Sequence, residues 1–321
     1  MPAFVRHKDS VRAFRVVLTL LAQSLPYAAC VSATVRPPIV EPVARAAAAA
    51  TRAVADQHVD VTADSIEPDR PDVTNGTHIV DEGLLQIEIG AQHARMGPSQ
   101  RSLGTPVTVR LGLFEWLEAR AGTDGFLYDT DGASSVSGAG NVQLGGKVRL
   151  FSDPGGVPVL SILGTINLPV ASVSKGLGSG DADVTLVLLT GADLGRTSHL
   201  DFNYGIGAIG AGGGREHFAQ HLVSVSLSHS LTEQFSPYVE AFWFSKQDLE
   251  GGAVVSVDGG FIHALTARLA IDGGVAVGVT RAAPDLSMFG GISIIIGDVL
   301  GDHGVIARQR RATRIRSRVP R

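Results

Sequence analysis

The sequence predicts an all-β protein, a closed antiparallel transmembrane β-barrel of about 12 strands. First, apolar and polar residues alternate strictly in short stretches such as 85–92, 107–113 and 142–150. Second, charged residues stand at polar positions in the middle of these stretches. Third, the chain is 44% hydrophobic, yet no apolar stretch after the N-terminus is long enough for a membrane helix. Because successive side chains of a strand point to opposite faces, such a sheet has one apolar and one charged face. A barrel gives the first to lipid and the second to water.

Residues 1–33 are predicted to be a secretory signal peptide. A basic start precedes the apolar stretch 16–22, and small residues at 31–33 fit a cleavage site. Cys30 is the single cysteine, so the chain can form no internal disulfide and no cysteine-based metal site. Lipid attachment at Cys30 is the weaker alternative, because Tyr27 stands where a branched aliphatic residue is usual.

Residues 34–80 are predicted to form a disordered periplasmic linker. They contain an alanine tract and a polar, acidic run with several prolines, and offer little apolar surface to bury. Residues 301–321 are predicted to be a basic disordered tail, because seven arginines and no acidic residue lie within 308–321. Between these ends acidic residues outnumber basic ones, which argues against a nucleic-acid partner.

The barrel itself is predicted to span residues 81–300. Most of its strands have the length that a tilted strand needs to cross a bilayer, and Gly, Pro and Asp lie between them. The polar stretches 123–139 and 171–182 are expected to be extracellular loops. The predicted strands are 83–95, 103–113, 115–122, 140–152, 157–169, 183–194, 199–210, 218–231, 235–247, 252–264, 267–279 and 286–297.

A soluble β-sandwich or lipocalin-like barrel is the main alternative fold. In such a protein the apolar face would point inward and the charges would face solvent. Strand number and strand length favour the membrane barrel. The aromatic content of 6% is low for the rings of aromatic residues that flank a membrane barrel.

Short motifs follow one another in a fixed order from about residue 69 to residue 296. These motifs lie at 69–75, 83–90, 105–113, 117–120, 138–147, 166–169, 257–260 and 270–274. In these motifs and their order the chain resembles the outer-membrane transporter family named for the MetA-pathway of phenol degradation. The resemblance implies an outer-membrane location and movement of hydrophobic or aromatic compounds. Residues 291–297 depart from the family pattern, because they lack its aromatic strand terminus.

Charged residues on the polar strand face are the candidate lining of a solute path. Basic residues gather in the early strands and acidic residues in the late strands, so two walls of opposite charge would face each other across the lumen. The alternative is that these charges pair with one another and fill the lumen. The candidates are Glu88, Arg110, Glu118, Arg120, Lys147, Arg149, Asp201, Glu240, Asp258 and Asp272.

Other motifs indicate no catalytic, cofactor or metal site. Residues 205–210 match the dinucleotide pattern G-x-G-x-x-G, but no amphipathic helix follows. His217 and His221 would share a strand face, but a metal site needs more ligands. Ser228 and His229 point to opposite faces of a strand, so they cannot form a nucleophile–base pair. We therefore predict a protein that is not an enzyme.

The predicted function is passive transport or binding of small, hydrophobic or aromatic solutes in the bacterial outer membrane. Expected partners are membrane lipid, the solute and, during biogenesis, the barrel-assembly machinery; the oligomeric state is left open. Two alternatives remain. One is a structural or adhesive barrel plugged by its own side chains. The other is a soluble exported β-protein that binds a ligand.

Overall fold

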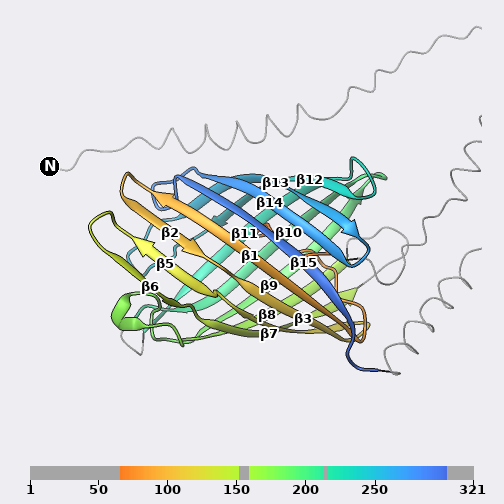
Figure 1. Ribbon diagram of the computed structural model, residues 1–321, viewed down its shortest axis with the longest axis horizontal. Helices are drawn as coiled ribbons and strands as arrows, with labels where there is room; N and C mark the ends of the chain where they lie inside the picture. The colour runs from red at the N-terminus through yellow and green to blue at the C-terminus, as the bar shows by residue number, and fades with distance from the viewer. Residues whose placement is uncertain (1–65, 152–158, 213–215, 302–321) are drawn as a thin grey trace, which may run out of the picture. The chain divides into compact units, whose positions relative to one another are not determined.

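A computed structural model describes residues 66–151, 159–212 and 216–301. The predicted signal peptide, most of the predicted linker and nearly all of the basic tail lie outside these ranges. The described chain forms one sheet of fifteen strands, which closes on itself where β15 pairs with β1. Figure 1 shows the strands tilted around the resulting barrel.

The strands follow one another around the wall as antiparallel neighbours. They are β1 (Leu84–Met96), β2 (Gln100–Gly104), β3 (Val107–Phe114), β4 (Leu117–Thr123), β5 (Phe126–Thr130), β6 (Ser135–Ala139), β7 (Val142–Phe151), β8 (Val159–Leu168), β9 (Asp183–Leu194), β10 (Ser198–Gly210), β11 (His217–His229), β12 (Phe235–Phe244), β13 (Val254–Thr266), β14 (Leu269–Gly278) and β15 (Leu286–Asp298). A short 3-10 helix, η1 (Val173–Lys175), lies between β8 and β9. Within the described ranges, no helix is long and apolar enough to cross a membrane.

Twelve strands make the closed wall, as the sequence predicts, because β2, β5 and β6 continue β3, β4 and β7. In the first half of β1 the partner is β3, and in its second half the partner is β2. The three breaks lie side by side: the amide of Thr105 donates to Phe126, and that of Gly140 donates to Gly125. Gly125 has φ 71°, and a Cβ there would overlap the carbonyl of Thr105, so the break needs glycine.

The expected extracellular loop at 123–139 is therefore wrong. Its residues form the hairpin β5–β6, which extends the wall at the end where β2 also lies (Figure 1). The sequence shows no clear alternation there, because Gly, Ser and Asp dominate the stretch. The second expected loop, 171–182, is confirmed as the connection between β8 and β9, with η1 inside it.

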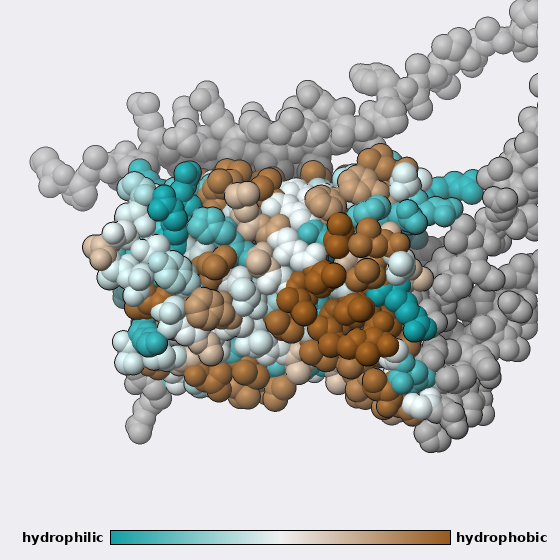
Figure 2. All heavy atoms as spheres, viewed as in Figure 1, coloured by the Kyte–Doolittle hydropathy of each residue, from teal (hydrophilic) through white to brown (hydrophobic). Residues whose placement is uncertain are grey.

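The two faces of the wall are as predicted for a membrane barrel. Large apolar side chains are exposed on the outside, among them Ile89, Leu186, Ile206 and Ile292. Figure 2 shows apolar residues gathered on the outer surface near β15 and β3. The alternating polar positions are buried inside, which excludes an apolar-core soluble barrel. This is the surface of an outer-membrane β-barrel.

Candidate functional site

The lumen is occupied by the chain's own residues 66–81, called here the lumen segment. These residues precede β1, and residues 66–80 belong to the stretch that the sequence predicts to be a disordered linker, because it contains few apolar residues. That prediction is wrong for 66–80. The segment is held by charged and polar side chains of the wall, which replace the apolar contacts that a folded segment usually needs.

The base of the lumen segment is apolar. Ile66 packs in a buried cluster with Val80, Leu84, Ala270 and Ile295. Its amide donates to the carbonyl of Ala267 at 2.7 Å, in the short turn between β13 and β14. Short turns and the ends of β1 and β15 share this end of the barrel, which is the periplasmic end in membrane barrels. The segment therefore rises into the lumen from the periplasmic side.

Asp69 joins the lumen segment to three basic residues of the wall. Its Oδ2 lies 2.6 Å from Lys147 Nζ and 2.7 Å from Arg120 Nη2. Arg110 Nη2 lies 3.5 Å from the same oxygen. These three cations, on β3, β4 and β7, are called the basic cluster. One carboxylate of the segment thus neutralises charge on three neighbouring strands.

Two carboxylates of the wall complete the basic cluster. Arg110 is fully buried; its Nε lies 2.9 Å from Glu118 Oε1, and its Nη1 lies 2.9 Å from Glu88 Oε1. Glu118 also accepts a hydrogen bond from the amide of Val80 at 2.9 Å. The cluster is therefore a closed network of cations and anions, in which wall and segment depend on each other.

The tip of the lumen segment reaches the opposite wall. Glu240 on β12 accepts hydrogen bonds from the amides of Val73, at 2.9 Å, and Thr74, at 2.6 Å. The hydroxyl of Thr74 donates to the same carboxylate. Arg70 donates to Asp272 at 3.5 Å and to the carbonyl of Gly290 at 3.2 Å. The segment therefore bridges the lumen from the early to the late strands.

Glycines of the inner face make room for the segment. Gly90 and Gly291 are paired across β1 and β15. A Cβ at Gly90 would lie 2.2 Å from the guanidinium of Arg70, and one at Gly291 would lie 2.7 Å from its Nε. The returning chain passes Gly112, where a Cβ would lie 2.2 Å from the carbonyl of Asp81. The glycines inside the strands thus mark close backbone approach.

Burial and surrounding charges shift the pKa values of two carboxyl groups of the lumen segment in opposite directions. Burial raises the pKa of Asp69, but the charges of Arg110, Lys147 and Arg120 outweigh it, so the pKa lies below its usual range. Burial and the nearby Glu240 carboxylate raise the pKa of Asp72. The early wall is thus matched in charge, whereas the late wall crowds carboxyl groups together.

The lumen segment separates two cavities. One, of about 590 Å³, lies toward the periplasmic side and is lined by Asp72, Thr77, Asp201 and Tyr238. The other, of about 230 Å³, lies against Arg120, Gln143 and Thr165 on the opposite side of the segment. Asp69 lines both. The basic cluster thus stands at the boundary between them.

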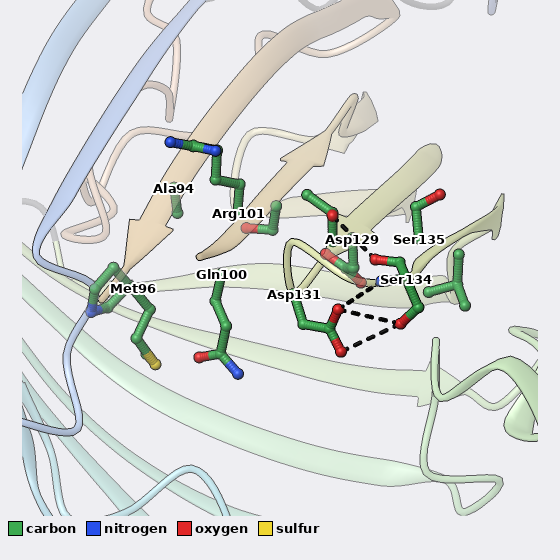
Figure 3. Close-up of a pocket in the computed structure, with 12 residues that line it drawn as sticks. Ala94, Met96, Gln100, Arg101, Asp129, Asp131, Ser134 and Ser135 are labelled. Atoms are coloured by element: carbon green, nitrogen blue, oxygen red, sulfur yellow. Dashed lines mark hydrogen bonds between the residues drawn. The ribbon is translucent and has the colours of Figure 1, made fainter. Parts of the chain in front are cut away.

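Two further cavities open at the extracellular end. One, of about 440 Å³, lies between the connection after η1 and the ends of β10 and β12. The other, of about 360 Å³, is shown in Figure 3 and lies between β1, β2 and the hairpin β5–β6. In that hairpin Asp131 accepts hydrogen bonds from Ser134, whose amide donates at 2.7 Å. Neither cavity touches the lumen segment.

The ten sequence candidates all point into the lumen, but their surroundings differ. Arg120 and Asp201 keep 12% and 18% of their side chains exposed, and Arg149 is also half-buried. Fully or nearly buried are Glu88, Arg110, Glu118, Lys147, Glu240, Asp258 and Asp272. The sequence pattern does not predict that residues 66–81 enter the lumen, although the motif at 69–75 lies within this segment. One signal in the sequence does indicate such a segment: the inward basic residues of the early strands outnumber the inward acidic ones, so they need a further carboxylate as partner.

Histidine and glycine motifs remain outside this site. Residues 205–210 lie within strand β10 and form no phosphate loop. Ser198 Oγ lies 2.9 Å from His229 Nδ1 across β10 and β11, a pair that sequence spacing did not suggest. Among the described residues, no ion pair joins His229 to a carboxylate. No group of His, Cys, Asp and Glu in the described ranges has metal-site geometry.

Comparison with known families identifies the chain. The model of the family described as "Putative MetA-pathway of phenol degradation" matches residues 68–295. The chain belongs to this family. The match begins inside the lumen segment, before the first strand, so the segment is part of the family's domain. No functionally curated protein is similar enough in sequence to count as a relative.

Solved structures with a similar fold are outer-membrane barrels. The COG4313 outer membrane channel from Pseudomonas putida F1 is 12% identical, with a TM-score of 0.55, covering 72% of this chain and 100% of that one. The NanC porin is 10% identical, with a TM-score of 0.46 and coverage of 65% and 98%. The CymD monoaromatic hydrocarbon channel is 9% identical, with a TM-score of 0.39 and coverage of 67% and 87%. The first of these supports the barrel fold.

Proposed function

We propose that the protein is a diffusion channel for small solutes in the outer membrane, with the lumen segment as its gate. The observation that carries this proposal is the position of Asp69, which lines the cavities on both sides of the segment. Moving this part of the chain would join the two cavities into one path. The hydrogen bonds and ion pairs that hold it are individually reversible on the timescale of loop motions.

Small aromatic compounds are the first solutes to test. The family description names phenol degradation, which supports an aromatic solute for this member. Of the ten inward charged residues, the four that line the two cavities are proposed to line its path, and Asp69 and Glu240 are contact points of the gate. These four are Glu88, Arg120, Arg149 and Asp201. Passive passage fits a barrel with two separate cavities of mixed polar and apolar lining rather than one continuous apolar tunnel.

Single-channel recording tests the gate. The purified protein is placed in planar bilayers beside a variant that lacks residues 68–79. We expect small or rare current steps from the complete chain and larger, long-lived steps from the deletion variant, because its two cavities become continuous. Heat-modifiability on a gel serves as the control that both barrels are folded.

A plugged structural barrel is the second candidate, favoured by the number of ion pairs that Asp69 makes. It predicts no conductance from the complete chain, and phenol uptake into liposomes that contain it no faster than into liposomes without protein. If neither the complete chain nor the folded deletion variant gives any current, the channel proposal is overturned. Conductance of the deletion variant alone would favour the plugged barrel.

A further inference from the structure

The cavity in Figure 3 lies on the continuation of the barrel's inner face at the extracellular end. Ala94 of β1 shares a strand face with the lumen residue Glu88, because alternate residues of a strand point to the same side. Ala94 is paired with Ser102 on β2. Ser102 is paired with Asp129 on β5, and Asp129 with Val136 on β6. Since paired residues share a face, four strands present one row of side chains to this cavity.

The turn between β14 and β15 forms another side of the cavity. The amide of Asp285 donates to the carbonyl of Arg95 at 2.8 Å, and the carboxylate of Asp285 accepts from the amide of Gly97 at 2.9 Å. These bonds hold the turn against β1, and the neighbouring Pro284 lines the cavity together with Met96. Met96 remains 38% exposed. A solute outside the cell can therefore reach this cavity without passing the gate.

The lining combines apolar side chains with a few polar groups, as small-molecule sites do. The cavity volume of about 360 Å³ lies near the lower end of the range for such sites, about 300–1,000 Å³. A small solute therefore fits it best. The apolar members of the lining are Ala94, Met96, Val136 and Pro284, and the polar members on the same face include Gln100, Ser102 and Asp129.

Asp129 supplies a carboxylate that is free to bind a solute. Asp131, in the same hairpin, accepts from the amide of Ser134 at 2.7 Å and thereby fixes the turn. Within the described ranges, no hydrogen bond or ion pair occupies the carboxylate of Asp129. Arg101 precedes Ser102 and lies on the opposite strand face. Figure 3 shows its guanidinium pointing away from Asp129.

We propose that this cavity captures small aromatic solutes that carry a hydroxyl group, before they reach the gate. The hydroxyl donates to Asp129 and accepts from Gln100 or Ser102, because a hydroxyl group both donates and accepts. The ring lies against the apolar members, where the sulfur of Met96 makes a favourable contact with it. A carboxylate on the solute would be repelled by Asp129, and an ammonium group would have no acceptor for the donors of Gln100 and Ser102. This inference rests on the proposed channel, because it gives the solute of that channel an entry site.

Calorimetric binding tests the site without relying on transport. The full-length protein in lipid nanodiscs is titrated with phenol and with anisole, in which a methyl group replaces the hydroxyl hydrogen; empty nanodiscs are the blank. We expect phenol to bind about tenfold more tightly than anisole, as one hydrogen bond to a charged group predicts. Benzoate and benzylamine should both bind more weakly than phenol. Asp129→Ala should weaken phenol binding about tenfold and leave anisole binding unchanged.

Asp248→Ala is the matched control, since Asp248 is exposed at the same end of the barrel and lines the other extracellular cavity. Its phenol affinity should equal that of the wild-type protein. Asp129→Asn keeps the shape of the side chain and should give an intermediate affinity, and heat-modifiability shows that each variant is folded.

Three results would overturn the inference. They are an unchanged phenol affinity in Asp129→Ala, an equal loss of phenol and anisole affinity in that variant, and tighter binding of benzoate or benzylamine than of phenol. Phenol binding that depends on Asp129, without current from the complete chain or the deletion variant, would leave the site standing and remove the channel. Current without phenol binding would do the reverse.

Discussion

Asp69 is the residue on which closure of the lumen depends most. Removing one partner of a buried ion pair leaves an uncompensated charge, which costs far more than an exposed pair contributes. Here a single carboxylate neutralises Arg110, Arg120 and Lys147 together. Ion pairs therefore hold the lumen segment in place, and the apolar contact of Ile66 is confined to its base.

Asp69→Asn should open the gate without unfolding the barrel. The amide keeps the shape of the side chain but supplies no negative charge, so the three buried cations repel one another. The free energy that holds the lumen segment in its docked position should therefore fall by about 3–5 kcal/mol. Single-channel recording should show a higher open probability than in the wild-type protein. Glu115→Gln, at an exposed carboxylate in the turn between β3 and β4, is the control and should leave the open probability unchanged.

The sequence predicts Arg110 as a candidate lining residue of a solute path, but its contacts give it a structural role. Had it lined an open pore, Arg110→Ala would change ion selectivity with little effect on stability. Instead the side chain is fully buried between Glu88 and Glu118, and its loss would leave both carboxylates unpaired. We expect Arg110→Ala to destabilise the barrel by about 3–5 kcal/mol, measured by urea unfolding from lipid vesicles. Arg101→Ala in β2 should change the free energy of unfolding much less.

At the scale of elements, glycine spacing decides where the segment can lie. Gly90→Ala places a methyl group where the guanidinium of Arg70 now sits. The far end of a flexible side chain can move, so the wall should keep its fold while the segment loses its contact with β1 and β15. We expect increased conductance and unchanged heat-modifiability. Ala91→Val, on the exposed face of β1, should alter neither.

A reversible tether tests whether the same segment moves. The side-chain oxygen of Asn203 accepts a hydrogen bond from the backbone amide of Asn75 at 2.7 Å. Cysteines at both positions, in a Cys30→Ser background, should form a disulfide that suppresses current until a reductant is added. Each single cysteine variant is the control. Equal current before and after reduction would show that motion of the tip is not needed.

At the scale of the whole molecule, the stability cost of a charged substitution on the outer face depends on how deep the residue lies in the membrane. Ile292 is an exposed apolar residue of β15, and an arginine on a lipid-facing position near the membrane centre costs about 2–4 kcal/mol. Ile292→Arg should therefore lower the free energy of unfolding in vesicles by this amount. Val299→Arg, just beyond the end of β15, should cost less than 1 kcal/mol, as expected near the interface. Similar losses at both sites would contradict the membrane position.

The wall could be predicted from sequence because each strand carries its own signal. Alternation reports which residues share a face, and this is a local property of the chain. It failed at 126–139, where small polar residues hide the alternation. The lumen segment could not be predicted in this way, because Asp69 acquires its partners from β3, β4 and β7. Those contacts form only after the barrel has closed, and no local pattern encodes them.

The pairing of Gly90 with Gly291 has a consequence for assembly order. These residues belong to the first and last strands, so they meet at the seam where the barrel closes, and Arg70 lies over both. The lumen segment is covalently joined to β1, but the place where Arg70 docks exists only once β1 and β15 have paired. We therefore expect biogenesis of this barrel to end with zipping of the seam, followed by docking of Arg70 over the two glycines.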